Sequence, residues 1–295
     1  PSPFLPAIAI LSTALTSAPA LQLAKGDRVC VVGNTFAERL QFSGYFETLL
    51  HARHPDHEIV FRNLSWSADT LTLKPRPLDC PTQDDFQKQY KAGVVIACYG
   101  LNESYETPLP QFRKDLEAFI DHTLQQKYDG QKSPRLVLIS PVAHEQMEAP
   151  GLPVARKRND VLEKYVEVMA ETAKAKKVEF VDIFHPLLQQ YAGTPGRKLT
   201  SNGIHLNDDG QRFVSSEIDA ALFGPPRNLA GKWTQEAMEV LRKVVNEKNL
   251  QFWYRHRPIN PFYIYGGRAA PFGTVSFPPE MEYLDGMVAN RERRV

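Results

Sequence analysis

Five short apolar runs, separated by amphipathic helical patterns and polar loops, constrain the fold of this chain more than any other feature. They cover residues 28–33, 58–64, 92–100, 135–141 and 178–184. Runs that are apolar on both faces suit strands covered by helices on both sides of a parallel sheet. Their alternation with helical segments therefore predicts an α/β fold, in which a parallel five-stranded sheet lies between two helical layers in a three-layer α/β/α arrangement.

The first apolar run ends at a glycine and leads directly into a helical pattern. Gly33 permits a sharp turn, and Asn34 and Thr35 follow it at the carboxyl end of the expected strand. Open α/β sheets bind their ligands at this edge, where the free N–H groups of a helix N-terminus can hold an anion. The plainer alternative is that Asn34 or Thr35 only caps the helix that begins near Phe36.

Composition and charge exclude several classes of function. The 295 residues are 42% hydrophobic, which is enough for a globular core, and 35 basic against 34 acidic residues give a net charge of +1. This balance gives no overall electrostatic reason to bind nucleic acid or an anionic membrane. No Cys-x-x-Cys pair or other metal-ligand spacing is present, so we expect neither a metal nor another cofactor.

The three cysteines are expected as free thiols. Cys30 and Cys98 lie inside apolar runs, where a cysteine is most simply a small buried hydrophobe, although a disulfide between them is conceivable if their strands are neighbours. Cys80 lies in a Pro-rich loop and is expected nearer to solvent.

The two ends of the chain differ from its middle. The apolar stretch at residues 4–15 and the Ala18-Pro19-Ala20 that follows resemble the end of a secretory signal, which predicts a periplasmic or secreted protein. No run approaches the ~20 apolar residues that a membrane span needs. We divide the chain into an N-terminal segment, an α/β domain and a C-terminal region, at residues 1–23, 24–224 and 225–295.

The C-terminal region is expected to form a helix followed by an extended tail rich in aromatic residues and arginine. The pattern is clearest at residues 252–258. Interleaved arginine and aromatic side chains could stack on sugar rings or bases. The plainer expectation is that these side chains pack back onto the α/β domain.

Four polar loops carry the chemistry of the sequence. They are Gly33-Asn34-Thr35, residues 63–67, residues 100–103 and residues 202–205, in that order. The set resembles the SGNH (GDSL-like) hydrolase family, whose blocks read Gly-Asp-Ser, a glycine, Gly-x-Asn-Asp and Asp-x-x-His. This resemblance covers about residues 24–223. It implies a flavodoxin-like SGNH fold and the hydrolysis of ester bonds by side chains without a cofactor.

The resemblance assigns a role to each matching residue. His205 stands where the family has its general base, and Asn102 stands where an asparagine helps to hold the oxyanion. Thr35 stands at the position of the nucleophilic serine; its extra methyl group stiffens χ1 and crowds the path of attack. Gly33 and Asn34 complete this first block, with Asn34 in place of the aspartate.

Two further positions depart from the family pattern. Ser65 replaces the block-two glycine, and the resemblance implies that its backbone N–H serves the oxyanion hole. Asn202 replaces the triad aspartate. An amide offers no negative charge to an imidazolium and can hold the wrong tautomer; the corresponding change in a serine protease lowers turnover by about 10⁴. A nearby carboxylate such as Asp208 could take over the orienting role.

Two functions follow. The first is an exported ester hydrolase that removes acyl groups such as acetyl, with a small-molecule or glycan ester as substrate. The second is a catalytically degenerate binding or assembly module that docks on a protein partner through residues 225–295. A carboxylate within reach of His205 and a hydrogen bond between Thr35 Oγ1 and that ring would favour catalysis.

Overall fold

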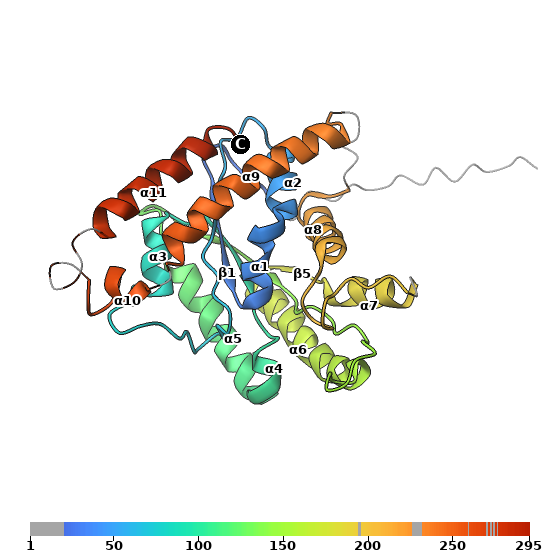
Figure 1. The fold of residues 1–295 in the computed structure, drawn as a ribbon. Coiled ribbons are helices and arrows are strands. Elements are labelled where there is room, and N and C mark those ends of the chain that lie inside the picture. The colour runs from blue at the N-terminus through green and yellow to red at the C-terminus, as the bar shows by residue number, and fades with distance from the viewer. Residues whose placement is uncertain are drawn as a thin grey trace, which may run out of the picture.

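The computed structural model describes residues 21–193, 196–225, 232–258, 260–269, 271, 273, 275 and 277–295. The signal-like stretch therefore lies outside the described residues. The strands are β1 Arg28–Gly33, β2 Val60–Asn63, β3 Val94–Cys98, β4 Arg135–Ile139 and β5 Glu179–Val181. The helices are α1 Thr35–Ser43, α2 Tyr45–Arg53, α3 Gln83–Gln89, α4 Glu103–Glu106, α5 Leu109–Gln125, α6 Ala155–Lys176, α7 Phe184–Gly193, α8 Asp208–Phe223, α9 Gln235–His256, α10 Pro261–Ile264 and α11 Phe277–Glu292 (Figure 1).

The five strands form one parallel sheet in the order β2-β1-β3-β4-β5, as the alternation of strands and helices predicted. In the register of this sheet Gly33 pairs with Cys98, and Cys98 pairs with Ile139. The last residues of three neighbouring strands therefore lie in one row. The loops that follow β1 and β3 leave the sheet side by side.

Each face of the sheet is covered by helices. Val31 and Ile96 face a core that includes residues of α1, α2 and α8, whereas Cys30 and Val95 face a second core that includes residues of α3 and α5. Helix α6 contributes to both cores. This is the predicted three-layer α/β/α arrangement. Successive residues of β1 face the two cores in turn, because side chains alternate between the two faces of a strand.

The sharp turn at the end of β1 requires glycine. Gly33 has φ of 141°, and a Cβ atom there would lie 2.3 Å from the Cys98 carbonyl oxygen. The backbones of β1 and β3 thus approach each other too closely for any side chain at this position. Cys30, Cys80 and Cys98 are free thiols, as expected, and Cys30 and Cys98 are buried.

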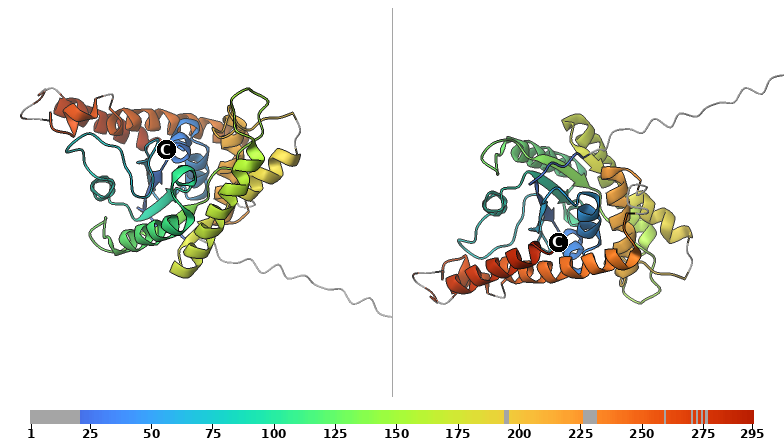
Figure 2. Two further views of the ribbon diagram at one scale, coloured as in Figure 1. Left: turned by 90° about the horizontal axis from the view of Figure 1, so that it is seen from below. Right: turned by 90° about the horizontal axis from the view of Figure 1, so that it is seen from above.

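The C-terminal region differs from its prediction. The expected helix is present as α9, but the expected extended tail is wrong over residues 277–292, which form the helix α11. Helices α9 and α11 pack side by side along the molecule, on the side of α1 and α2 (Figures 1 and 2). The tail lacks a regular apolar period, which is why the sequence pattern did not indicate this helix.

Helices α9 and α11 also cover β2, which is an edge strand of the sheet. Arg62 of β2 donates two hydrogen bonds to the Glu292 carboxylate of α11, at 2.7 and 2.8 Å. Lys248 of α9 is 1% exposed, donates to the Phe61 carbonyl at 3.3 Å and forms an ion pair with Glu47 of α2. An edge strand covered in this way is protected from pairing with another chain. Within the described ranges, no helix is long and apolar enough to cross a membrane.

Candidate active site

Asn34 and Thr35 begin helix α1 at the carboxyl edge of the sheet. Asn34 is 2% exposed, and its Oδ1 accepts a hydrogen bond from the Phe36 N–H at 3.1 Å, so it is the N-cap of α1. Its side chain therefore stabilises the helix, which is the plainer alternative that the sequence offered for it, and its role towards a substrate stays a prediction. Gly33 is buried as well and acts through its backbone alone.

Thr35 is half-exposed at the first position of α1. The N–H group at this position has no acceptor within the helix. In the part of the chain that the structure describes, the Thr35 hydroxyl makes no hydrogen bond. It does not cap its helix, and the hydrogen bond to the His205 ring that would favour catalysis is not formed, since the hydrogen bond of that ring is with Asn202. Arg39, one turn further along, lies on the same half-exposed face, while the residues between them are buried.

The loop after β2 offers one free backbone N–H, and it does not belong to Ser65. The Ser65 N–H donates to Asn63 Oδ1 at 3.1 Å, and Ser65 is 1% exposed. Of the N–H groups from residue 64 to residue 70, only that of Ala68 lacks an acceptor. Ala68 is exposed and has φ of 69°, a conformation that glycine adopts more easily. Because position 68 is an alanine, no glycine marked this turn in the sequence.

Asn102 joins this loop to the end of β3. Its Nδ2 donates to the Asp69 carbonyl oxygen at 3.0 Å, which leaves the second N–H of the amide for a ligand. The next residue, Glu103, is 3% exposed and accepts hydrogen bonds from the N–H groups of Leu71 and Gly100, at 2.8 and 2.7 Å. Glu103 therefore fixes both loops, a role that sequence reasoning missed.

Asn202 and His205 face each other in the loop before α8. Asn202 Oδ1 accepts the His205 backbone N–H at 3.0 Å and the Ile204 N–H at 3.4 Å. This fixes the orientation of the amide, because the reverse orientation would point its NH₂ group at two donors. Nδ2 of Asn202 then lies 3.1 Å from His205 Nδ1 and donates to it. The imidazole proton is consequently on Nε2, the nitrogen that a general base must keep free.

Burial and a neighbouring charge act on His205. Partial burial of the ring lowers the pKa of His205 below its usual range, and the positive charge of Arg39 lowers it further. The ring is therefore neutral at pH 7.

Glu145 holds the loop that carries Asn202 and His205. Its carboxylate is buried and accepts hydrogen bonds from the Leu199 N–H, the Thr200 N–H and the Thr200 hydroxyl, the last two at 2.8 and 2.7 Å. Its own N–H donates to the Gly203 carbonyl at 2.8 Å. The sequence pattern did not indicate this role, because the partners of Glu145 are more than fifty residues away along the chain.

Among the residues that the structure describes, no carboxylate replaces the missing aspartate beside His205. Asp208, the candidate from the sequence, accepts from the Tyr45 hydroxyl at 2.8 Å and pairs with Arg212 on the exposed surface. Within the described residues, no aspartate or glutamate forms a hydrogen bond with the His205 ring. The same ranges contain no group of three His, Cys, Asp or Glu side chains that could hold a metal ion.

Comparison with solved structures shows the same fold elsewhere. The chain resembles an acetylxylan esterase from Geobacillus stearothermophilus at 16% identity and a TM-score of 0.54, covering 68% of this chain and 96% of the other. A GDSL-like lipase from Parabacteroides merdae, itself described as putative, matches at 12% identity and a TM-score of 0.55, covering 69% and 99%.

A gut microbial diltiazem-metabolizing enzyme matches at 18% identity and a TM-score of 0.51, covering 70% of this chain and 49% of that protein. The chain thus spans about half the length of that relative. At these identities the likeness establishes the fold alone. A search of curated proteins found no match.

The family assignment comes from the sequence profile of the GDSL-like Lipase/Acylhydrolase family. This profile matches residues 30–213, which include β2 to β5, most of β1 and the four polar loops. The chain therefore belongs to the GDSL-like lipase/acylhydrolase family of ester-hydrolysing enzymes.

Proposed function

We propose that this family member hydrolyses acyl esters with Thr35 as nucleophile and His205 as base. The observation that supports the proposal is the Thr35 hydroxyl, half-exposed and without a partner at the start of α1, on the helix face whose Arg39 acts electrostatically on His205. A free hydroxyl and a neutral imidazole at one sheet edge are the two groups that nucleophilic acyl transfer needs.

The oxyanion hole in this proposal consists of two backbone groups and one side chain. The N–H groups of Thr35 and Ala68 lack acceptors, and the Asn102 amide keeps one N–H after its bond to Asp69. These donors stabilise the negative charge that develops on the ester oxygen when Thr35 Oγ1 attacks the carbonyl carbon. In this scheme Ala68 replaces Ser65, whose N–H is already bonded.

Proton transfer is the slow part of the proposed reaction. His205 Nε2 accepts the Thr35 proton only in the tautomer that carries its hydrogen on Nδ1, and the amide of Asn202 disfavours that tautomer. His205 returns this proton to the leaving alcohol as the ester C–O bond breaks and the threonine ester forms. Water then attacks the threonine ester by the same route, giving its proton to His205, and the acid is released as Thr35 takes the proton back. We therefore expect a slow hydrolase with an intact oxyanion hole.

The proposed substrate class is the acetylated carbohydrate. Its support is the likeness to an acetylxylan esterase, which is an analogy between folds.

The test is acetate release from acetylated xylooligosaccharides, measured by NMR, beside hydrolysis of p-nitrophenyl acetate. We expect activity on both that is lost in Thr35→Ala and His205→Ala. His122→Ala is the matched control, because His122 is exposed and pairs with Asp84. Wild-type rates equal to those of His205→Ala on both substrates would contradict the proposal.

One observation favours the second candidate function, a binding module without catalysis. The hydrogen bond from Asn202 Nδ2 to His205 Nδ1 joins two neutral side chains and leaves the hydrogen on His205 Nε2. That Nε2–H can donate a hydrogen bond to an acceptor atom of a bound ligand. In this case an acetylated oligosaccharide would bind with the same affinity to wild type and to Thr35→Ala, and neither protein would release acetate. Isothermal titration with the acetylated xylooligosaccharide separates the two functions.

A further inference from the structure

The indole of Trp66 in the loop after β2 is held by the C-terminal region. Trp66 is 8% exposed, and its Nε1–H donates to His256 Nε2 over 3.3 Å. His256 closes helix α9 and is 1% exposed, with its ring against those of Phe86 and Phe252. Burial lowers the pKa of His256 to about 3, so the ring is neutral and its Nε2 can accept this hydrogen bond at pH 7.

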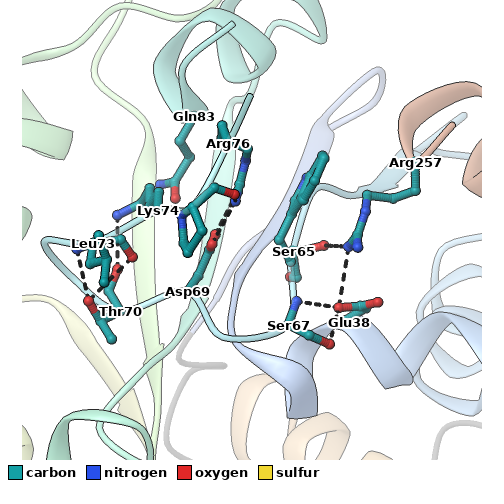
Figure 3. Close-up of polar contacts among 12 residues, drawn as sticks. Glu38, Ser65, Ser67, Asp69, Thr70, Leu73, Lys74, Arg76, Gln83 and Arg257 are labelled. Atoms are coloured by element: carbon teal, nitrogen blue, oxygen red, sulfur yellow. Dashed lines mark hydrogen bonds and ion pairs between the residues drawn. The ribbon is translucent and has the colours of Figure 1, made fainter. Parts of the chain in front are cut away.

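Two arginines stack on the same indole ring. The guanidinium carbon of Arg257 lies 3.8 Å from the ring centroid, and that of Arg76 lies 4.0 Å from it. Figure 3 shows these two arginines approaching the loop from different sides. Arg76 is tied to Asp69 by two hydrogen bonds of 2.8 Å, so the stacked ring and the end of the loop are held together. Contacts this close are favourable for a partly desolvated cation over tryptophan.

Arg257 also connects this loop to the helix that carries the nucleophile. Its Nη1 lies 3.3 Å from Glu38 Oε2 and 3.5 Å from the Ser65 carbonyl oxygen. The same Glu38 oxygen accepts hydrogen bonds from the backbone N–H and the hydroxyl of Ser67 (Figure 3). Glu38 belongs to α1, one turn after Thr35. A single carboxylate thus links α1, the loop and the C-terminal region.

The free N–H of Ala68 lies between these attachments. Ser67 before it is bonded to Glu38, and Asp69 after it is bonded to Arg76, while the Asp69 carbonyl accepts from Asn102. Ala68 itself makes no such contact and has φ of 69°. Its backbone therefore keeps a conformation that is unfavourable for alanine because the residues on either side are fixed.

We infer that the C-terminal region, through His256 and Arg257, positions the loop that presents the Ala68 N–H to the oxyanion. Both residues lie beyond residue 213, where the match to the family profile ends. The rest of the region is anchored independently of the loop, by the buried Lys248–Glu47 ion pair and by the packing of Asn246 against Gly44. Arg257 is a positioning residue in this scheme, since it acts through Glu38 and Trp66. The inference rests on the proposed function for its catalytic part only.

The test measures loop order and catalysis separately. Hydrogen exchange of the backbone across residues 64–70, followed by mass spectrometry, is compared for wild type, Arg257→Ala, Arg257→Lys and Arg294→Ala. Arg294 is the matched control, because its exposed ion pair with Glu247 stays within the C-terminal region. In Arg257→Ala, we expect the peptide that contains the Ser67 N–H to exchange about tenfold faster than in wild type. Arg257→Lys keeps the charge beside Glu38, so its exchange rate should be intermediate. Arg294→Ala should exchange at the wild-type rate.

Kinetics on p-nitrophenyl acetate supply the second measurement. Arg257→Ala is expected to lower kcat about tenfold with little change in KM, because an oxyanion donor acts in the transition state, and Arg257→Lys should recover part of the loss. Unchanged exchange in Arg257→Ala would overturn the inference, as would faster exchange with an unchanged kcat. If the wild type hydrolyses no ester, the proposed function fails, and the exchange rates alone still decide whether Arg257 positions the loop.

Discussion

Asn202 donates a hydrogen bond from Nδ2 to His205 Nδ1 over 3.1 Å, in the position where the family places an aspartate that accepts one. The direction of this hydrogen bond decides the chemistry of the site. An acceptor at residue 202 would hold the proton on Nδ1 and leave Nε2 free to take the proton of Thr35, whereas the amide does the reverse. In the proposed mechanism the sheet edge supplies a nucleophile, an imidazole and oxyanion donors, but the imidazole favours the less reactive tautomer.

Replacing this amide by a carboxylate should raise activity. In Asn202→Asp the carboxylate can accept from the His205 and Ile204 backbone N–H groups and from Nδ1–H together. We expect kcat for p-nitrophenyl acetate to rise at least roughly tenfold, a part of the factor of about 10⁴ that the reverse change costs a serine protease. Asn207→Asp is the control, since it adds the same charge at the N-cap of α8 without touching the ring. Equal rates for wild type and Asn202→Asp would show that tautomer choice does not limit the reaction.

The side chain at position 35 offers a second test. Thr35→Ser keeps the hydroxyl and removes the methyl group that restricts χ1. Relief of about 1 kcal/mol of rotamer restriction would raise kcat roughly fivefold, while Thr35→Ala should abolish turnover. Single-turnover kinetics with p-nitrophenyl acetate check both variants. A Thr35→Ala variant that still forms an acyl-enzyme would exclude residue 35 as the nucleophile.

The pH dependence of kcat/KM should report the neutral form of His205. Because burial and Arg39 lower the pKa of His205, the rate is expected to rise with pH through a midpoint below 6.5 and then to level off. Arg39→Met removes the nearby positive charge and should move this midpoint to higher pH, and Asn202→Asp should move it further. Arg156→Met, on the exposed side of α6, serves as control. A midpoint that does not respond to Arg39→Met would assign it to another group.

Glu145 should contribute to the stability of the protein. Glu145→Ala leaves the N–H groups of Leu199 and Thr200 without their acceptor in a buried place, which we expect to lower the free energy of unfolding by about 3 kcal/mol. Urea unfolding measures this, and Glu148→Ala, at an exposed position nearby, should change it by less than about 0.5 kcal/mol. If the two variants were equally stable, Glu145 would not be what holds the Asn202–His205 loop.

The two buried imidazoles predict a loss of stability in acid. Burial lowers the pKa of His144 to about 4 and that of His256 to about 3, so both rings fold in the neutral form. Their full contribution is present above the unfolded pKa near 6.5, and it falls as the pH drops towards the folded values, because the unfolded chain then binds more protons. When the pH falls from 7 to 5, each ring should lower the free energy of unfolding by about 2 kcal/mol, which urea unfolding measures. His256→Phe should reduce this pH dependence by about half; an unchanged slope would contradict the burial of a neutral His256.

The sequence predicted the fold because the signals involved are local. The apolar runs such as 28–33 and 92–100 carry the period and length of buried strands, and the helices between them can pack only as layers on a parallel sheet. The order of the four polar loops along the chain then predicted that Thr35, Asn102 and His205 lie at one edge of the sheet. The α11 helix escaped prediction because its residues show no regular apolar period, and packing against α9 stabilises it.

By itself, then, the sequence determined the sheet, the family and the residue types at the sheet edge. Only the tertiary structure decided which groups are free to act. The Ser65 N–H is bonded to Asn63 and the Ala68 N–H is not, and the Asn202 amide is oriented by two backbone donors. His256 and Arg257 reach Trp66 from about 190 residues away along the chain. Hydrogen-bond direction and availability depend on partners that are distant in sequence, and such partners leave no local pattern to read.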